Sequence, residues 1–243
     1  MLTPEQIDRL VEGRDADPFA TLGVHPADPD SGKTGFTACV LLPDAVSVSA
    51  QTLDGKPVGE LALIHPAGLF EGKVKIRKRQ PLRYEAQYAD GGRYATIDPY
   101  GFGPVLGPMD DYYFAEGSHK RLFEKLGAHP MEHEGIAGTH FAVWAPNARR
   151  VSVVGDFNDW NRETHPLEKL PTGVWQLKLS PEALAHGQKV KLHITGADGS
   201  RRDRIPACIR RAVQDPTTHD YCGQIWNPPA PHVWQHSFDP ASI

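Results

Sequence analysis

The sequence predicts an all-β protein made of two tandem immunoglobulin-like β-sandwiches with a short N-terminal helix. Three observations predict this fold class. A length of 243 residues suits two domains of ordinary size. The 23 glycines and 22 prolines are scattered along the chain, which is typical of many short strands joined by turns. The third and most informative observation is an internal repeat.

The repeat begins with two similar octapeptides. Residues 19–26 read Phe-Ala-Thr-Leu-Gly-Val-His-Pro and residues 123–130 read Phe-Glu-Lys-Leu-Gly-Ala-His-Pro, which are five identities in eight positions. Further similar segments follow in the same order in both halves. They pair 43–45 with 146–148, 46–48 with 151–153, 68–70 with 173–175, 89–91 with 197–199, and 98–99 with 215–216. The offset jumps at the last pair, which places an insertion in the second copy between Gly199 and Asp215. Six pairs in register indicate a duplication.

Local signals predict the elements. Thr3 caps the N-terminal helix, Pro4 suits its first turn, Gln6 completes a capping box and Gly13 ends it. β-rich runs that end at a proline or meet at Ala-Asp-Gly turns predict the strands. In the first copy these runs are 36–42, 46–50, 69–76 and 82–88, and in the second copy they are 139–145, 151–154, 174–179 and 189–195.

The predicted division of the chain is a helix over 1–14, a first sandwich over 15–108, a second sandwich over 109–229 and a connector over 230–243. Residues 100–123 link the copies, and within this link Ser118 is predicted to cap a short helix that ends at Gly127. The segment from Gln224 to His236 is rich in Pro and Trp and lacks strand periodicity. We therefore expect it to be an ordered connector that follows the protein surface.

Composition and motifs argue against several function classes. A formal charge of −4 argues against a general nucleic-acid binder. Cys39, Cys208 and Cys222 lack metal-ligand spacing and fit free thiols in a reducing compartment. With no signal peptide and no apolar run of membrane-spanning length, we predict a cytoplasmic chain without a membrane partner. No phosphate loop, dinucleotide fingerprint or nucleophile motif occurs, so we predict no catalytic residue, cofactor or metal.

The sharpest local signal is a tryptophan in a polar loop. Trp160 follows a predicted strand and is flanked by Asn158, Asp159 and Asn161. An aromatic ring can stack on the C–H face of a sugar while neighbouring polar side chains bond its hydroxyls. The alternative, which carries equal weight, is that Trp160 folds back as a lid on the sandwich. The matching segment of the first copy, residues 50–55, has no aromatic residue, so a site of this kind belongs to the second copy.

Three other residues of interest lie on predicted strands. Lys191 shares a face with His193 on an alternating strand, where it either reaches ligand hydroxyls or belongs to an ordinary solvated face. Trp144 and Trp175 lie within apolar strands, and we predict core packing for both.

Two other clusters have ordinary structural interpretations. His129 and His133 are four residues apart, but the neighbouring Gly127 and Pro130 argue against a helix, so we predict a structural turn rather than a zinc site. The arginine-rich insertion over 201–211 lacks the interleaved aromatic residues of an RNA-binding segment, and we predict a docking surface for another domain.

Several segments resemble a known family. Residues 141–161, Phe-Ala-Val-Trp-Ala-Pro-Asn-Ala-Arg-Arg-Val-Ser-Val-Val-Gly-Asp-Phe-Asn-Asp-Trp-Asn, resemble the starch- and glycogen-binding module called carbohydrate-binding family 48. Residues 113–130 are similar to the lead-in to that module in bacterial glycogen branching enzymes. Residues 17–26 resemble the start of the extra N-terminal sandwich of some of those enzymes, and residues 204–211 and 224–229 resemble the lead-out toward their catalytic barrel.

The resemblance implies a function in glycogen branching. A retaining barrel would cleave an α-1,4 bond through a glycosyl-enzyme intermediate and transfer the chain to a 6-hydroxyl, with a carboxylate nucleophile and a general acid/base. In the family both groups belong to the barrel, so none is carried over to this chain, which is expected to be inactive alone. The implied partners are α-glucan and the barrel in cis. Trp160 matches the motif's loop tryptophan and Lys191 matches a strand lysine of related glycogen-binding modules. A second binding tryptophan of some relatives would fall near 197–199 and is absent.

Two alternatives stay beside this hypothesis. One is a free-standing glycogen-binding or regulatory adaptor, and the other is a module of a related debranching enzyme. The candidate sugar-contacting residues are Trp160, Lys191, Asn158 and Asn161.

Overall fold

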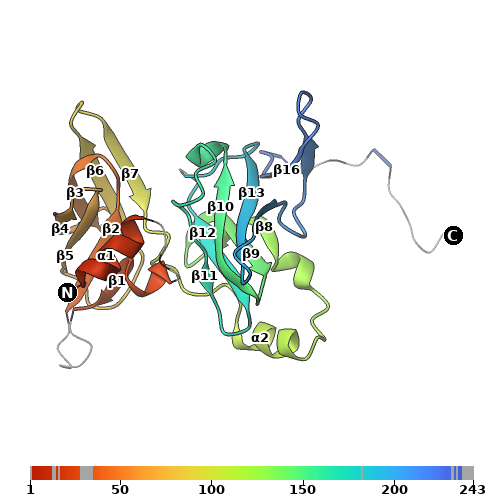
Figure 1. Cartoon of the computed structure of the whole chain (residues 1–243), viewed down its shortest axis with the longest axis horizontal. Helices are drawn as coiled ribbons and strands as arrows, with labels where there is room; N and C mark the ends of the chain where they lie inside the picture. The colour runs from red at the N-terminus through yellow and green to blue at the C-terminus, as the bar shows by residue number, and fades with distance from the viewer. Residues whose placement is uncertain are drawn as a thin grey trace.

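A computed structural model describes residues 2–12, 15, 17–27, 35–181, 183–230, 233 and 235–236. Nearly all regular structure is β, arranged in two lobes side by side (Figure 1). We call the strands between residues 23 and 97 the first sandwich and those between residues 127 and 224 the second sandwich. The predicted all-β fold with tandem sandwiches is confirmed.

The N-terminal helix α1 (Pro4–Val11) begins as predicted. The Thr3 side chain accepts a hydrogen bond from the backbone of Gln6, and the Gln6 side chain accepts one from the backbone of Thr3. Ile7 and Leu10 pack on the outside of the first sandwich with Leu22 and neighbouring residues. The predicted stop at Gly13 lies outside the described residues.

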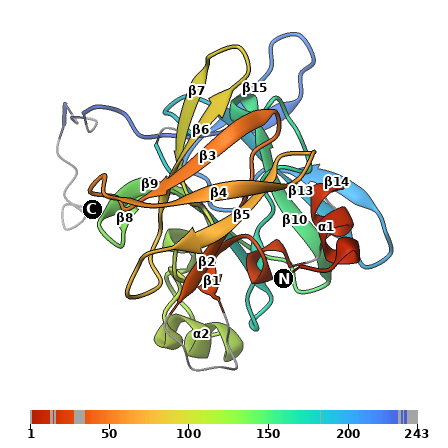
Figure 2. The same ribbon diagram turned by 90° about the vertical axis from the view of Figure 1, so that its left-hand side faces the viewer.

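The first sandwich is one curled sheet in the order β1-β2-β5-β4-β3-β6-β7 (Figure 2). Its strands are β1 (Gly23–Pro26), β2 (Phe36–Leu41), β3 (Ala45–Gln51), β4 (Pro57–His65), β5 (Leu69–Val74), β6 (Arg83–Tyr88) and β7 (Arg93–Ile97). Strand β4 pairs with β3 near Leu61 and with β5 from Ala62 onward, so it carries the sheet from one layer to the other. Val48, Phe70 and Tyr84 form part of the core that the two layers enclose.

The second sandwich consists of two separate sheets. One has the order β11-β12-β9-β8, and the other has the order β10-β13-β16-β15 with β14 beside β13. The strands are β8 (Gly127–His133), β9 (Ile136–Trp144), β10 (Ala148–Gly155), β11 (Glu168–Lys169), β12 (Val174–Leu179), β13 (Lys189–Gly196), β14 (Arg201–Arg204), β15 (Ala212–Gln214) and β16 (Tyr221–Gln224). Phe141, Val153, Trp175 and Leu192 form part of the core between them.

Two predictions in the second half were wrong. His129 and His133 lie on β8, not in a turn, and Pro130 is tolerated there because β8 is an edge strand. Ser118 caps no helix. The link instead contains α2 (Pro108–Ala115), which begins at Gly107, and only the 3₁₀ turn η2 (Leu122–Glu124) near the predicted helix. The predicted connector from Gln224 onward overlaps β16 (Tyr221–Gln224) only at its first residue.

The two tryptophans that were predicted to pack in the core differ in burial. Trp175 is buried, with its indole N–H donating to the Ala145 carbonyl at 2.9 Å, so that prediction is confirmed. Trp144 is 54% exposed, so that prediction was wrong. Phe141 and Val143 face the core, and alternation along β9 therefore turns Trp144 to the opposite face of the sheet.

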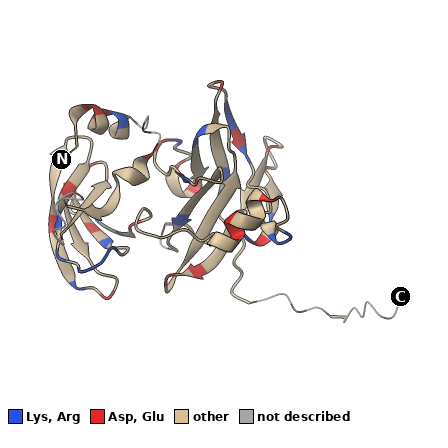
Figure 3. Ribbon diagram, turned by 90° about the horizontal axis from the view of Figure 1, so that it is seen from below, with Lys and Arg blue, Asp and Glu red and all other residues tan. Residues whose placement is uncertain are grey.

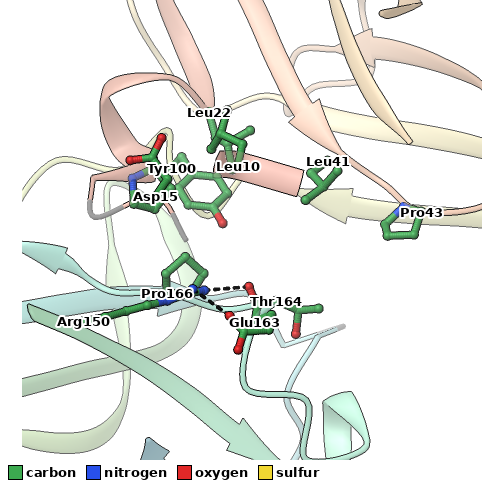
Figure 4. A pocket seen from close by; sticks show the side chains of 11 residues that line it. Leu10, Asp15, Leu22, Leu41, Pro43, Tyr100, Arg150, Glu163, Thr164 and Pro166 are labelled. Carbon is green, nitrogen blue, oxygen red and sulfur yellow. Dashed lines mark hydrogen bonds and ion pairs between the residues drawn. The ribbon is translucent and has the colours of Figure 1, made fainter. Parts of the chain in front are cut away.

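The two sandwiches meet around Phe19 and Tyr100. Their rings lie 4.8 Å apart edge to face, and Phe19 also packs against the second core. A cavity of about 70 Å³ lies beside them, lined by Tyr100 from one side and by Arg150 and Glu163 from the other (Figure 4). The Arg150 guanidinium donates to the Glu163 carboxylate at 2.7 Å. The cavity has room for only a few water molecules, so we interpret it as a packing gap at the junction.

Acidic and basic residues are interspersed over both sandwiches and no face is uniformly basic in the view of Figure 3. Among the described residues, no helix is long and apolar enough to cross a membrane.

Candidate carbohydrate-binding site

The loop after β10 has an unusual backbone. It begins with the 3₁₀ turn η3 (Asp156–Asn158), and then Asp159 and Trp160 both adopt the left-handed conformation, with φ of 51° and 58°. The amide of Trp160 donates to the Gly155 carbonyl at 3.0 Å and closes the turn. A bulky residue with positive φ is uncommon, and such a conformation persists only where the surrounding contacts hold it. The loop therefore places Trp160 in one defined position.

Asn158 is the residue that holds the loop. Its Oδ1 accepts from the Gly155 amide at 3.0 Å, and its Nδ2 donates to the carbonyls of Val153 and Asn161, each at 3.1 Å. Nδ2 also lies within hydrogen-bond distance of His165. Because these internal bonds already engage both ends of the amide, Asn158 acts on the shape of the loop.

Trp160 is half-buried and does not pack into the core of the second sandwich. Asn161 is exposed, and its Oδ1 accepts from the Glu163 amide at 2.9 Å. No hydrogen bond of the Asn161 Nδ2 is recorded within the described part of the chain. A ligand lying on the loop would meet the Trp160 ring and the Asn161 amide, and their contact with sugar stays a prediction.

The neighbouring sheet contributes a row of paired charges. Lys191 and His193 lie on the outer side of β13, since Val190 and Leu192 between them face the core. Lys191 forms an ion pair with Asp220, and the His193 Nδ1 lies 2.6 Å from the Asp203 Oδ1. Arg162, in the tryptophan loop, donates to the other Asp203 oxygen at 2.8 Å. The Arg162–Asp203 bond thus ties the tryptophan loop to β14.

The charges in this row balance one another. Partial burial opposes ionisation of Asp203, but hydrogen bonds from Arg162 and His193 outweigh it and lower the pKa of its carboxyl. The hydrogen bond from Lys191 likewise lowers the pKa of Asp220. Both carboxylates therefore stay ionised and paired at neutral pH. A surface of compensated donors and acceptors beside an aromatic ring suits a neutral polyhydroxyl ligand better than a charged one.

The first sandwich lacks this arrangement. The connection after β3 is a short turn in which the Thr52 amide donates to the Lys56 carbonyl at 2.9 Å. Gly55 takes the positive φ that the turn requires. No long loop and no aromatic side chain is present there, in agreement with the asymmetry between the two copies that the sequence predicts.

The sequence interpretation missed Asp203, Asp220 and Arg162. Asp203 lies opposite His193 in the hairpin that turns at residues 197–199. Counting the strand register outward from that turn would have paired Asp203 with His193 from the sequence. Arg162 and Asp203 are 41 residues apart, and no local pattern links them. The two histidines on β8 make separate contacts: the His129 Nε2 bonds the Leu126 carbonyl and the His133 Nε2 bonds the Gly103 carbonyl.

Two family models match the chain. Residues 3–100 match the alpha-1,4-glucan branching enzyme GlgB, N-terminal domain. Residues 125–209 match Carbohydrate-binding module 48 (Isoamylase N-terminal domain). The chain matches the amino-terminal region of 1,4-alpha-glucan branching enzymes over most of its length. The resemblance seen in the sequence is thereby confirmed, and the adaptor and debranching alternatives are not favoured.

Curated relatives in this branching enzyme family come from several bacteria. Proteins named 1,4-alpha-glucan branching enzyme GlgB from Mesorhizobium japonicum, Rhizobium meliloti and Agrobacterium fabrum are 49%, 50% and 51% identical over 223, 201 and 199 residues. The matches cover 87%, 82% and 82% of this chain but only 29%, 26% and 26% of those proteins. The chain therefore spans less than a third of the length of these branching enzymes.

The solved structures that this chain matches include pullulanase type I from Bacillus subtilis str. 168 complexed with maltose, at a TM-score of 0.38 and 15% identity. That match covers 86% of this chain and 27% of the pullulanase. Pullulanase from Anoxybacillus sp. LM18-11 matches at a TM-score of 0.33 and 14% identity, over 87% and 27% of the two chains. We draw nothing further from these matches.

Proposed function

We propose that this chain is the non-catalytic region of a glycogen branching enzyme that positions α-glucan and supports the catalytic barrel. The complete enzyme would transfer α-1,4-glucan chains to form α-1,6 branches. The observation that carries the proposal is the loop over 156–165, which holds Trp160 in a left-handed conformation beside a row of neutralised polar groups. The relatives that share about half of its residues are named branching enzymes, which supports the reaction class.

The proposed site assigns a separate role to each predicted residue. The Trp160 ring stacks on a glucosyl unit, and the Asn161 amide donates to a hydroxyl. Lys191, held by Asp220, supplies a further donor on β13. Asn158 acts through the loop and is a positioning residue. One or two stacked sugars on an open surface leave little free energy after the cost of ordering, so we expect weak binding.

The catalytic steps belong to the part of the enzyme outside this chain. We expect no branching activity from these residues alone, because the carboxylate nucleophile and the general acid/base of the family lie in the barrel. The division into 1–14, 15–108, 109–229 and 230–243 and a cytoplasmic location are part of the same proposal. Three free cysteines support a reducing compartment.

Affinity electrophoresis in gels containing glycogen tests the glucan site. We expect glycogen to retard the parent chain and the Trp160→Ala variant to lose most of that retardation. Trp144→Ala is the matched control, because it removes an exposed tryptophan from the other sheet and should migrate like the parent. Equal retardation of Trp160→Ala and the parent would mean that the loop tryptophan is structural.

Sequencing the gene beyond the codon for Ile243 tests the enzyme assignment. A reading frame that continues into alternating strands and helices supports a branching enzyme. A stop codon at that point would contradict it.

A further inference from the structure

A polar groove lies on the outer face of the first sandwich, across β4, β3, β6 and β7, which lie side by side (Figure 2). Its volume is about 280 Å³, close to the lower end of the range for small-ligand sites, which begins at about 300 Å³. The polar residues that line it are Ser47, Ser49, Glu60, Glu85, Gln87 and Arg93. The loop that carries Trp160 belongs to the other sandwich, so this groove is separate from the proposed glucan site.

Strand alternation places these polar side chains on one face of the sheet. Val48 and Ala50 on β3 and Ala86 on β6 are buried in the core, so the residues between them point outward. Strand register aligns the outward residues in two rows. One row crosses four strands and consists of Glu60, Ser49, Glu85 and Ala95, and the next crosses three strands and consists of Ser47, Gln87 and Arg93. Because neighbouring strands lie about 4.8 Å apart, the first row forms a continuous surface about 14 Å long.

Side-chain length explains why this surface is hollow. Ser47 and Ser49 on the central strand β3 have short side chains. The longer Glu60 lies on one side of them on β4, and Glu85 and Gln87 lie on the other side on β6. Short side chains between long ones leave a groove along β3 whose floor and walls can both form hydrogen bonds.

The long polar side chains of the groove are available to a ligand. Among the described residues, the side chains of Glu60, Glu85, Gln87 and Arg93 make no hydrogen bond or ion pair with one another or with other residues. They supply carboxylate oxygens, an amide and a guanidinium. Each of these planar groups presents two polar atoms, which can engage two adjacent hydroxyls of one sugar ring.

Charge and composition favour a neutral polyhydroxyl ligand. The carboxylates of Glu60 and Glu85 repel an anion such as a nucleic acid, and the guanidinium of Arg93 repels a cation. Glu, Ser and Ala are depleted at the centre of protein interfaces, yet they supply much of this lining. A hydroxyl both donates and accepts, so a sugar can satisfy donors and acceptors that are mixed in this way.

We propose that this groove is a second α-glucan site, on the first sandwich. The inference rests on the proposed function, from which the choice of α-glucan among neutral polyhydroxyl ligands follows. A glucan bound there lies along β3 between Glu60 and the pair Glu85 and Gln87, so both sandwiches hold glucan. Hydrogen bonds that replace bonds to water contribute little net free energy, and we therefore expect weak binding.

Nuclear magnetic resonance of the isolated chain, titrated with maltoheptaose, tests the groove. We expect the amide signals of residues 45–51 and 83–95 to shift, in addition to those of residues 156–165 at the tryptophan loop. The double variant Glu85→Ala, Gln87→Ala removes two hydrogen-bonding side chains and should bind maltoheptaose at the groove at least about tenfold more weakly, with unchanged shifts at the loop. Lys73→Ala, which changes an exposed side chain on β5 outside the groove, is the control and should behave like the parent.

A second variant tests the same site by filling it. Ser49→Arg places a long side chain on the floor of the groove and should also abolish the shifts of residues 83–95. If both variants keep the parent's shifts and affinity at the groove, the inference is wrong. Equal shifts of residues 45–51 and 83–95 with sorbitol, at the same concentration of hydroxyl groups, would also overturn it, because the groove would then not recognise a glucan.

The two glucan sites can fail separately. Shifts confined to residues 156–165 would overturn the groove and leave the proposed function standing. Shifts confined to the first sandwich would support the groove and contradict the site at Trp160. In Trp160→Ala the shifts at the groove should persist, and their loss would contradict two independent sites.

Discussion

Replacing Asp98 with asparagine tests whether one buried carboxyl makes the first sandwich less stable as pH rises. Asp98 is completely buried at the end of β7. Its Oδ1 accepts from the Tyr100 amide at 3.0 Å and its Oδ2 accepts from the Tyr84 hydroxyl at 3.3 Å. Burial raises the pKa of this carboxyl from 3.8 to about 7, although both hydrogen bonds act to lower it.

The sign of the effect follows from linkage. A carboxyl whose pKa is higher in the folded than in the unfolded state stabilises the fold fully at low pH, and this stabilisation is lost as pH rises through the folded pKa. With values of 3.8 and about 7, the free energy of unfolding should fall by about 2 kcal/mol between pH 5 and pH 7 through Asp98 alone. Asp98→Asn removes this dependence while keeping the acceptor for Tyr100, and the tyrosine oxygen can accept from the new amide.

Urea unfolding of the parent and the variant at pH 5, 6 and 7 measures this difference. Far-UV circular dichroism follows the transition, because all five tryptophans lie at or beyond position 144 and report on the second sandwich. We expect the parent to lose about 2 kcal/mol more than Asp98→Asn over this range. Asp90→Asn, in an exposed turn, is the control and should follow the parent. If the parent and Asp98→Asn keep a constant difference in stability from pH 5 to pH 7, the reasoning is wrong.

Four further substitutions test the second sandwich, and a fifth, in the first sandwich, serves as a control. Trp175→Ala should cost about 3–5 kcal/mol and Trp144→Ala less than about 0.5 kcal/mol in the isolated chain, measured from urea midpoints. Similar costs would contradict their assignment to opposite faces of the sheet that contains β9 and β12. Gly155→Ala places a Cβ atom against the Lys189 carbonyl oxygen at the start of β13. The free energy of unfolding should therefore fall by about 1–3 kcal/mol, seen as a lower melting temperature. Gly35→Ala meets only an ordinary 3.5 Å contact and should change little. Asn158→Ala should cost about 1–3 kcal/mol and reduce retardation in glycogen gels even though the loop tryptophan remains, and unchanged retardation would rule out its positioning role.

Much of the fold could be predicted because its signals are local. The predicted run 174–179 is identical to β12, and the other seven predicted runs overlap strands to within a few residues. Strand β4 was missed because its exposed residues include the apolar Leu63 and Ile64, which hide the alternation of a half-buried strand. Helix α2 was missed because it has little amphipathic pattern and no side-chain cap at Gly107.

The candidate site was predictable only in part, because some of its residues are distant from one another in sequence. The loop tryptophan and its polar neighbours are adjacent in sequence, so the pattern is visible there. The partner of His193 lies on β14, 10 residues further along the chain. The partner of Lys191 lies in the turn before β16, 29 residues further along. The sequence suggested Asn158 as a sugar contact, but the bonds that engage its amide lead to backbone positions that only the folded loop brings together.

The sequence by itself determined that this protein is a duplication of β-sandwich units. It also determined that the loop with a tryptophan among polar residues belongs to the second copy, since the matching segment of the first copy has no aromatic residue. Repeats, turn residues and strand periodicity are properties of neighbouring residues, so they can be read without coordinates. The tertiary structure decided which face of each strand is covered. It turned Trp144 outward because Phe141 and Val143 face the core, and it balanced the carboxylates with cations distant in sequence. Burial and ion pairing depend on which layer packs against which, and that is settled only when both sheets are assembled.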